Sequence, residues 1–219
     1  MDRELLAWLY TQGADIAGTS CPGSLLPERF AKLPYAVTVG VRLSDAVISE
    51  VTDGPTMLYF AHYRAANAYL DALTFKCMGW IQRQGYNALA IPASQSTGDN
   101  GYAGDFPHKT AANLAGLGFV GKSALFVSRD FGPRLRLATV LTDMPLPAGD
   151  MQPMQCGDCR ACVDACPCGA LTGKAWSVSG VREDILDAAL CSRHMKKAYQ
   201  HIGRGAVCGI CMAVCPMGK

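Results

Sequence analysis

The chain has 219 residues, with 20 basic and 18 acidic side chains and a formal net charge of +2. Half of the residues are hydrophobic, which excludes a disordered chain. The sequence has no long run of like charge of the kind that indicates a nucleic-acid partner. No apolar run reaches the roughly 18–20 residues of a membrane-spanning helix, and the N-terminus lacks the apolar core of a secretion signal. We therefore expect a cytoplasmic protein without a membrane segment.

The first 150 residues alternate between helical and extended patterns. One helix is expected at residues 2–12 and a much longer one at 56–84, where apolar side chains recur at helical spacing without an internal proline. Three strands, rich in β-branched and apolar residues, are expected in YAVTVGVRL, NALAIPAS and LRLATVLTDM, with a short helix, TAANLAGLG, before the last. This alternation predicts a domain that mixes helices with a sheet, of the α/β or α+β class.

A change of composition marks the end of this part of the chain. Residues 143–155, DMPLPAGDMQPMQ, contain three prolines and one glycine and are typical of a linker. Nine of the eleven cysteines follow this linker. We expect two domains, a cofactor and substrate domain over residues 1–150 and a small, loop-rich cysteine domain over residues 151–219.

The first cysteine run has the spacing of an iron–sulfur protein. Its spacing, C-x2-C-x2-C-x3-C-P, is that of the bacterial ferredoxin run, in which three thiolates bind one [4Fe–4S] cluster and the fourth binds the other. The run consists of Cys156, Cys159, Cys162 and Cys166, followed by Pro167. Zinc also binds C-x2-C pairs, but a zinc site usually combines two such pairs, so the four-cysteine run favours clusters.

The second group, Cys208-x2-Cys211-x3-Cys215-Pro216, has one cysteine fewer. If the ligands are shared as in two-cluster ferredoxins, Cys215 completes the first cluster. The second cluster then has Cys166, Cys208 and Cys211 and needs a fourth ligand. Cys191 is the first candidate for this ligand. Cys168 is the rival, although it follows Cys166 so closely that both would strain to bind one cluster.

The chain resembles the epoxyqueuosine reductases and their relatives, the reductive dehalogenases, in HKTAANLAGLGFVGKSALFVSRDFG, LATVLTDMPL, CGDCRACVDACPCGAL, Cys191 and CGICMAVCP. The resemblance implies an α+β fold, with a nitroreductase-like cobalamin-binding domain followed by a bacterial-type dicluster ferredoxin domain. It supports Cys191 as a cluster ligand, because the family has a cysteine at the equivalent place. It implies that two clusters pass electrons to a corrinoid, with FMN as the alternative cofactor.

The same resemblance suggests cofactor-binding residues. In AGLGFVGK, Gly118 and Gly121 would let the backbone approach a flat macrocycle. Lys122 of this motif and the nearby Ser123 and Ser128 would form hydrogen bonds with the amide side chains at the edge of the macrocycle. The competing interpretation is that the glycines only make tight turns between a helix and a strand.

Weaker candidates for the same pocket lie on the long helix and in a loop. Arg64 shares one side of the helix with polar and tyrosine side chains, which are equally typical of a solvated face. Ser94 and Gln95 belong to IPASQSTGDNGY, a stretch of loop formers that would suit a lid. The polar side of the helix comprises Tyr59, His62, Tyr63, Arg64 and Asn67.

The proton donor departs from the family pattern. Epoxyqueuosine reductases carry a catalytic Asp, a Pro two residues later and then a Glu, whereas this chain reads Asp105-Phe106-Pro107-His108. Breaking a C–O bond needs a proton donor, for which Asp105, His108 and Tyr102 are the candidates. Asp105 is equally typical of an acid that precedes a helix.

The chain ends four residues after Cys215, whereas epoxyqueuosine reductases continue into a helical repeat domain that helps grip tRNA. We therefore expect a truncated relative for which tRNA is an unlikely partner. No twin-arginine export signal is present, which argues against a respiratory dehalogenase. The expected function is an iron–sulfur, cobalamin-dependent reductase of an unidentified small substrate, supplied by a ferredoxin or flavodoxin. The alternatives are an epoxyqueuosine (tRNA) reductase and a corrinoid-reducing or electron-transfer partner without its own substrate.

Overall fold

The computed structural model describes residues 2–95 and 102–218 and divides into two compact units. Residues 1–42, 66–118 and 135–152 form the first, which we call the sheet unit. Residues 43–65, 119–134 and 153–219 form the second, the cysteine unit. The cysteine unit therefore includes two segments that precede the cysteine-rich part of the sequence. The predicted domain boundary near residue 150 stays a prediction.

The sheet unit is built on a four-stranded antiparallel sheet with the strand order β1-β2-β6-β3. Its strands are β1 (Ile16–Ser20), β2 (Tyr35–Arg42), β3 (Ala88–Ile91) and β6 (Leu135–Thr142). The central strands β2 and β6 are buried along nearly their whole length, which explains their continuous runs of apolar residues. Thr38 and Thr139 face each other in this pairing, with their hydroxyl oxygens 3.4 Å apart.

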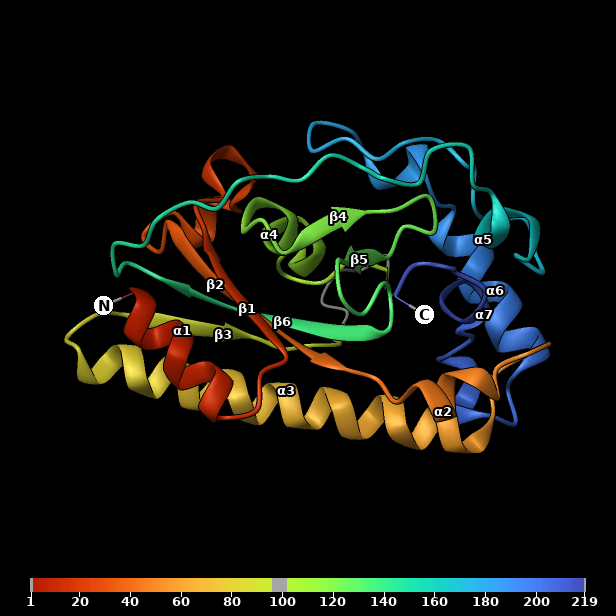
Figure 1. The fold of residues 1–219 in the computed structure, drawn as a ribbon, viewed down its shortest axis with the longest axis horizontal. Helices are drawn as coiled ribbons and strands as arrows, with labels where there is room; N and C mark the ends of the chain where they lie inside the picture. The colour runs from red at the N-terminus through yellow and green to blue at the C-terminus, as the bar shows by residue number, and fades with distance from the viewer. Residues whose placement is uncertain (1, 96–101, 219) are drawn as a thin grey trace. The chain divides into compact units, whose positions relative to one another are not determined.

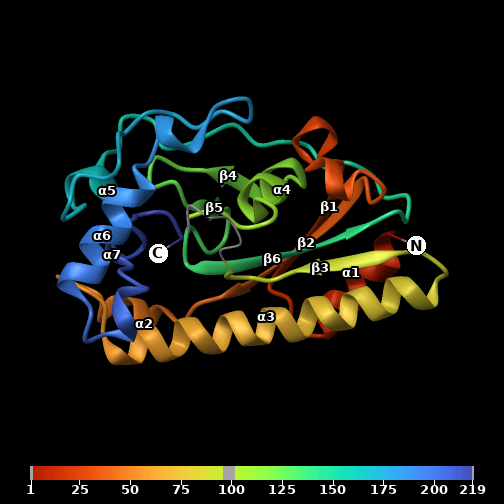
Figure 2. The same ribbon diagram turned by 180° about the vertical axis from the view of Figure 1, so that it is seen from behind.

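Helices cover both faces of this sheet. The sheet unit holds α1 (Asp2–Thr11), α4 (His108–Leu114), residues 66–83 of α3 (Met57–Arg83) and the short 3-10 turns η1 (Gly23–Leu25) and η2 (Glu28–Phe30). Helix α4 lies on one face, against β1, β2 and β6, while α1 and α3 lie on the other (Figures 1 and 2). Trp8 of α1 stacks on Trp80 of α3 with ring centroids 6.3 Å apart.

The cysteine unit has short helices and a small core. Its described elements are α2 (Asp45–Ser49), residues 57–65 of α3, the hairpin of β4 (Gly118–Val120, whose first residue belongs to the sheet unit) and β5 (Phe126–Ser128), α5 (Ala161–Asp164), η3 (Arg182–Asp184), α6 (Ala188–Ala198), η4 (Gly203–Gly205) and α7 (Ile210–Ala213). Val120, Ala124, Leu171 and Ile185 form a buried cluster, against which Cys162, Cys166 and Cys211 pack. The core of this unit thus lies directly beside its thiols.

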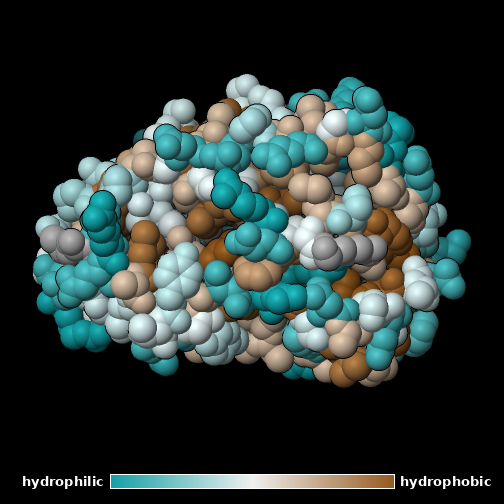
Figure 3. All heavy atoms as spheres, in the orientation of Figure 1, coloured by the Kyte–Doolittle hydropathy of each residue, from teal (hydrophilic) through white to brown (hydrophobic). Residues whose placement is uncertain are grey.

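The predicted mixed class, with helices packed on a sheet, is confirmed. The long helix and the three expected strands are present, and the short fourth helix begins at His108, two residues before the expected start. Strands β1, β4 and β5 were not expected. Within the described residues, no helix is long and apolar enough to cross a membrane. Hydrophobic and hydrophilic residues intermingle on the face shown in Figure 3.

Candidate metal centre

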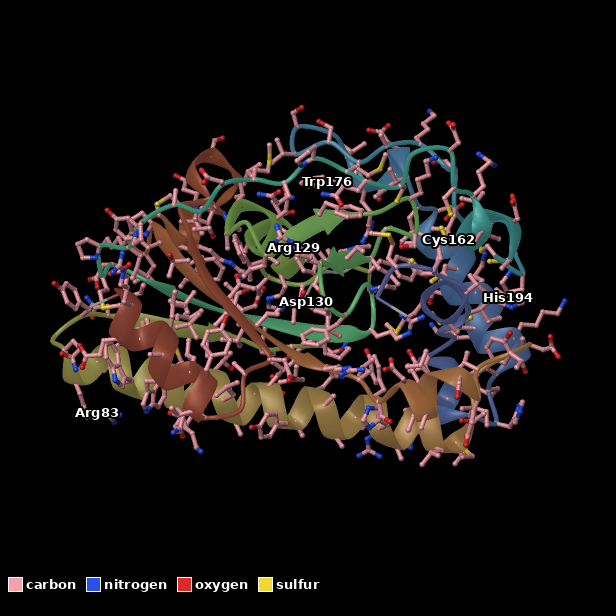
Figure 4. All side chains as sticks on the ribbon, in the orientation of Figure 1. Arg83, Arg129, Asp130, Cys162, Trp176 and His194 are labelled. Carbon is pink, nitrogen blue, oxygen red and sulfur yellow. The ribbon has the colours of Figure 1, made fainter. Side chains whose placement is uncertain are left out.

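Four thiols of the cysteine unit form what we call the first group: Cys156, Cys159, Cys162 and Cys215. The pKa of the Cys162 thiol is raised by burial and then by the neighbouring Cys156, Cys215 and Cys159. The pKa of Cys215 is raised by burial, with further contributions from Cys156 and Cys159. Thiols from the start and the end of the cysteine-rich segment therefore meet, as the ferredoxin spacing predicts. Sulfur atoms, drawn in yellow, gather in the region of Cys162 (Figure 4).

Five other thiols form the second group: Cys166, Cys168, Cys191, Cys208 and Cys211. Burial raises the pKa of Cys211 to about 12, and Cys208 and Cys191 contribute most among its charged neighbours. The pKa of Cys191 is raised to about 11 by burial and then by Cys168, Cys208 and Cys166. The Sγ atoms of Cys166 and Cys168 lie 3.9 Å apart. Both candidates for the fourth ligand are thus in the second group, and the choice of Cys191 stays a prediction.

Two local devices place the second-group thiols. Asp187 caps α6 by accepting a hydrogen bond from the Leu190 amide at 2.8 Å, which fixes Cys191 in the first turn of the helix. Gly209 precedes α7 with a left-handed φ of 89°, and a side chain there would meet the Tyr59 ring at 2.9 Å. The turn between Cys208 and Cys211 therefore needs a glycine for both conformation and space.

The first group is held by the segment 119–134, which precedes the cysteine-rich part of the chain. Lys122 Nζ donates hydrogen bonds to the carbonyl oxygens of Gly157, at 2.6 Å, and Cys159, at 3.2 Å. A side chain at Gly121 would come within 3.4 Å of Cys156 Sγ. The motif GFVGK thus packs directly on the first-group loop.

Arg134 closes the other side of the same group. Its guanidinium donates to the carbonyl oxygens of Cys215, at 3.0 Å, and Met217, at 2.9 Å. The side chain is only 4% exposed, so both hydrogen bonds are shielded from water. Sequence reasoning missed this residue, because nothing in the local pattern distinguishes it from a surface arginine.

The donors of both groups fit cubane clusters. Four or more thiols and no obligatory oxygen ligand make a soft donor set, which suits iron–sulfur clusters. No three His, Cys, Asp or Glu side chains among the described residues are placed to hold a single metal ion. A cubane does not require that convergence, because each thiolate binds a different iron. Gathering thiolates raises their pKa values, and bound iron would offset this repulsion.

The residues predicted for the corrinoid edge have partners inside their own turns. Ser123 Oγ accepts a hydrogen bond from the Leu125 amide at 3.3 Å, and Ser128 Oγ accepts one from Phe131 at 3.1 Å. The Gly118 carbonyl accepts from the Asn113 side chain at 2.8 Å. These contacts match the interpretation of the stretch as turn-forming. A corrinoid contact by these residues stays a prediction.

The polar side of the long helix serves several purposes. The Arg64 guanidinium lies 5.6 Å from the centroid of the Phe60 ring, and His62 Nε2 accepts from the Ser44 amide at 3.0 Å. Asn67 accepts from Arg136 Nε at 2.9 Å within the sheet unit. The predicted lid, residues 91–102, lies partly outside the described residues. Ser94 and Gln95 are described and exposed, and their role in a pocket stays a prediction.

The three predicted proton donors differ in their surroundings. The Asp105 carboxylate forms an ion pair with the Arg29 guanidinium. His108 Nδ1 lies 2.9 Å from Thr139 Oγ1, and its Nε2 lies 3.0 Å from the Pro92 carbonyl. Because a carbonyl only accepts, Nε2 carries the hydrogen and Nδ1 accepts from the threonine hydroxyl.

Burial lowers the pKa of His108 from 6.5 to about 4, so the ring is neutral near pH 7. The Tyr102 side chain is exposed. Asp105 and His108 both have structural partners in the sheet unit, which makes neither of them a ready proton donor. Their catalytic role stays a prediction.

Comparisons with known proteins add the family context. Residues 155–218 match the 4Fe-4S double cluster binding domain. The epoxyqueuosine reductase of Vibrio cholerae is 26% identical over 215 residues, covering 90% of this chain and 51% of the relative. That of Gloeobacter violaceus is 31% identical over 124 residues, covering 52% of this chain and 36% of the relative. The chain therefore spans about half or less of the length of these curated relatives.

Solved structures share the fold. A reductive dehalogenase whose structure suggests a mechanism for B12-dependent dehalogenation matches with a TM-score of 0.74, at 21% identity, over 98% of this chain and 31% of its own. An epoxyqueuosine reductase with an epoxyqueuosine-modified tRNA stem loop matches with a TM-score of 0.64, at 18% identity, over 99% of this chain and 64% of its own. The predicted resemblance is thus confirmed: the chain is similar in sequence to epoxyqueuosine reductases, shares its fold with them and with reductive dehalogenases, and carries a 4Fe-4S double cluster binding domain at residues 155–218.

Proposed function

We propose that the protein is an iron–sulfur reductase of the epoxyqueuosine reductase type, with two [4Fe–4S] clusters and an epoxyqueuosine-modified tRNA as substrate. The observation that carries the proposal is the gathering of nine thiols into two groups, of which the first has four members and the second five. The double cluster domain match at residues 155–218 supports the same conclusion.

The tRNA substrate was the alternative in the sequence-based interpretation, and the comparisons favour it over an unidentified small molecule. The two curated relatives are epoxyqueuosine reductases, and one structural neighbour holds a modified tRNA stem loop. The expectation that tRNA is an unlikely partner finds no support in these relatives. The electron donor remains a proposal: a ferredoxin or flavodoxin of low potential suits cubane clusters.

We assign the first cluster to Cys156, Cys159, Cys162 and Cys215, and the second to Cys166, Cys191, Cys208 and Cys211. The side chains and backbone around them hold the thiolates in place before iron binds, which lowers the cost of ordering each loop. Burial of Cys211 and of the adjoining core excludes water from the second group. Exclusion of water protects reduced iron and sulfide from side reactions.

A corrinoid is the proposed electron acceptor of the clusters. The B12-dependent dehalogenation attributed to the reductive dehalogenase neighbour supports cobalamin, whereas no comparison supports FMN. When bound, a corrinoid supplies a metal centre that takes up electrons singly and delivers them to a carbon–oxygen bond. Lys122, Ser123 and Ser128 form hydrogen bonds within the cysteine unit and stay candidate donors to the amide side chains of the corrinoid.

Reduction of a C–O bond also requires a proton. Of the three candidates, Tyr102 has an exposed side chain. The ion pair of Asp105 with Arg29 favours the carboxylate, and His108 is neutral with its Nε2 hydrogen engaged by Pro92. We therefore place Tyr102 ahead of the other two as the proton source.

Anaerobic reconstitution followed by a turnover assay tests this function. We expect about eight irons and eight sulfides per chain, as two cubanes require. With cobalamin and a strong reductant, the protein should then convert epoxyqueuosine in modified tRNA to the deoxygenated nucleoside, measured by nucleoside mass spectrometry. Fully loaded protein that binds no modified tRNA and produces no conversion would contradict the substrate. One or two zinc ions in place of the iron would contradict the clusters.

A further inference from the structure

The two thiol groups of the cysteine unit differ in the charge placed around them. Beside the first group, Lys122 Nζ lies within hydrogen-bond distance of the Gly157 and Cys159 carbonyl oxygens. On another side of the same group, the buried Arg134 guanidinium donates to the carbonyl oxygens of Cys215 and Met217. Two cations thus bind the backbone of the first-group cysteines directly.

The second group has a different surrounding. The charged side chains nearest to Cys191 in sequence are exposed and of opposite sign: Asp187, which caps α6 and is hydrogen-bonded to the Leu190 amide at 2.8 Å, and Arg193, two residues after Cys191. A neutral phenol, Tyr199, lies at the other end of α6 and donates its hydroxyl to the Asp53 carbonyl at 3.1 Å. The second group is therefore flanked by exposed charges of both signs and a neutral hydroxyl, whereas the first group has two cations hydrogen-bonded to its backbone.

Carboxylates near Arg134 and Arg160 reduce the difference in local charge between the two thiol groups, but they do not remove it. Asp45 Oδ1 lies 3.7 Å from Arg134 Nε, but the aspartate side chain is 51% exposed, whereas that of Arg134 is 4% exposed. Water screens the exposed carboxylate more than it screens the buried guanidinium. Arg160 also lies in the first-group loop, but it is exposed and pairs with Asp164 at 3.7 Å, so the two charges largely cancel.

Charge and solvent exposure both set the potential of a cluster. An added electron makes a cluster more negative, so nearby cations, hydrogen bonds and water stabilise the reduced form. Cys159 of the first group is exposed. The first group therefore combines cationic support with access to solvent, and both effects act in the same direction.

We infer that Lys122 and Arg134 give the first cluster the higher reduction potential, so that an electron delivered to the second cluster moves on to the first. In this step a reduced [4Fe–4S]+ centre at the second group becomes [4Fe–4S]2+, and the first makes the opposite change. No bond breaks and no proton is required. The inference rests on the two clusters of the proposed function and adds the order in which they hold the electron.

A redox titration followed by electron paramagnetic resonance tests this order. Reconstituted full-length protein is expected to show two midpoint potentials. Cys211→Ser, which removes a second-group ligand, should abolish the lower midpoint and keep the upper one. Cys159→Ser should do the reverse. If Cys211→Ser abolishes the upper midpoint instead, the inferred order is wrong. Iron analysis precedes the titration, so failure to form two clusters is separated from a reversed order.

Removing the charge of Lys122 or Arg134 tests whether these cations cause the difference in reduction potential. Lys122→Gln keeps a hydrogen-bond donor but loses the charge, and it should move the upper midpoint to a lower potential while leaving the lower midpoint in place. Arg134→Gln should act in the same direction, and Lys122→Gln still decides the matter if the arginine variant does not fold. Lys197→Gln, an exposed lysine of α6, is the matched control and should move neither midpoint. An unchanged upper midpoint in Lys122→Gln would overturn the assignment.

Discussion

The two thiol groups of the cysteine unit are built by different means. Residues 119–134 hold the first group through side chains that bind its carbonyl oxygens and through glycines that permit close approach. The second group relies on a capped helix and on aromatic rings at the start of α3, where a side chain at Gly203 would clash with Phe60. Charged side chains thus hold the first group in place through hydrogen bonds, whereas apolar packing holds the second.

This difference has a consequence for the cysteine-rich segment. Residues 119–134 and the start of α3 precede this segment by 20 residues or more, and they belong to the same compact unit. A ferredoxin-like segment over residues 155–218 therefore depends on the earlier chain for its geometry. Changes in residues 43–65 should affect the second cluster, and changes in residues 119–134 should affect the first.

Loss of a ligand should have the largest effect. Cys191→Ala is expected to lose about half of the iron and sulfide, because the second cluster would keep only three thiolates. Cys168→Ala is the matched control, since Cys168 lies in the same group without being assigned as a ligand. Iron and sulfide analysis after anaerobic reconstitution measures both variants. Full iron in Cys191→Ala together with loss in Cys168→Ala would reverse the ligand choice.

The next largest effect is expected from a substitution that disturbs the contact between residues 119–134 and the first thiol group. Gly132 has a φ of 54°, and a side chain there would clash with the Met217 carbonyl beside the first group. Gly132→Ala is expected to cost about 2–5 kcal/mol in the free energy of unfolding, from backbone strain and overpacking together. The variant should also release iron from the first cluster before the second.

Gly157→Ala provides the control for this variant. Gly157 has a similar φ of 49°, but no atom lies near a side chain added there. This substitution should therefore show the strain alone, about 1 kcal/mol. Equal losses of stability in the two variants, measured by chemical denaturation, would mean that the contact with Met217 contributes nothing.

The pH dependence of stability reports on His108 in the sheet unit. Its folded pKa of about 4 lies below the ordinary value of 6.5, so the unfolded chain binds a proton that the folded chain does not. Stability should fall as the pH decreases from about 6.5 to about 4, by about 3 kcal/mol in total, and be unaffected above that range. His108→Gln should remove this part of the slope. A wild-type slope retained in the variant would show that another group causes it and that folding does not lower the pKa of His108.

The sequence predicted those features that depend on local pattern. Apolar periodicity located α3, and β-branched runs located β2 and β6. Cysteine spacing predicted which thiols would meet at the first group. Strand β1, IAGTS, was missed because its small and polar residues lack the alternation of a half-buried strand, although all five are buried.

The roles of Lys122 and Arg134 were beyond local pattern. Arg134 contacts the Cys215 carbonyl across 81 residues of sequence, and Lys122 contacts Gly157 across 35. No periodicity reports such a pairing. His108 shows the same limit, since its hydrogen-bond partners Pro92 and Thr139 lie 16 and 31 residues away in sequence.

The smallest effect is expected at Tyr199, which separates packing from hydrogen bonding at the second group. Its hydroxyl donates to the Asp53 carbonyl, joining the end of α6 to the loop before α3, and its ring meets His194 edge-on with centroids 5.5 Å apart. Tyr199→Phe keeps the ring contact and loses one partly exposed hydrogen bond, so it should cost about 1 kcal/mol in unfolding free energy and no iron. Tyr199→Ala, which also removes the ring, should cost more and release iron from the second cluster. If Tyr199→Phe alone releases that iron, hydrogen bonding rather than apolar packing holds the second group. Both groups would then be held by hydrogen bonds.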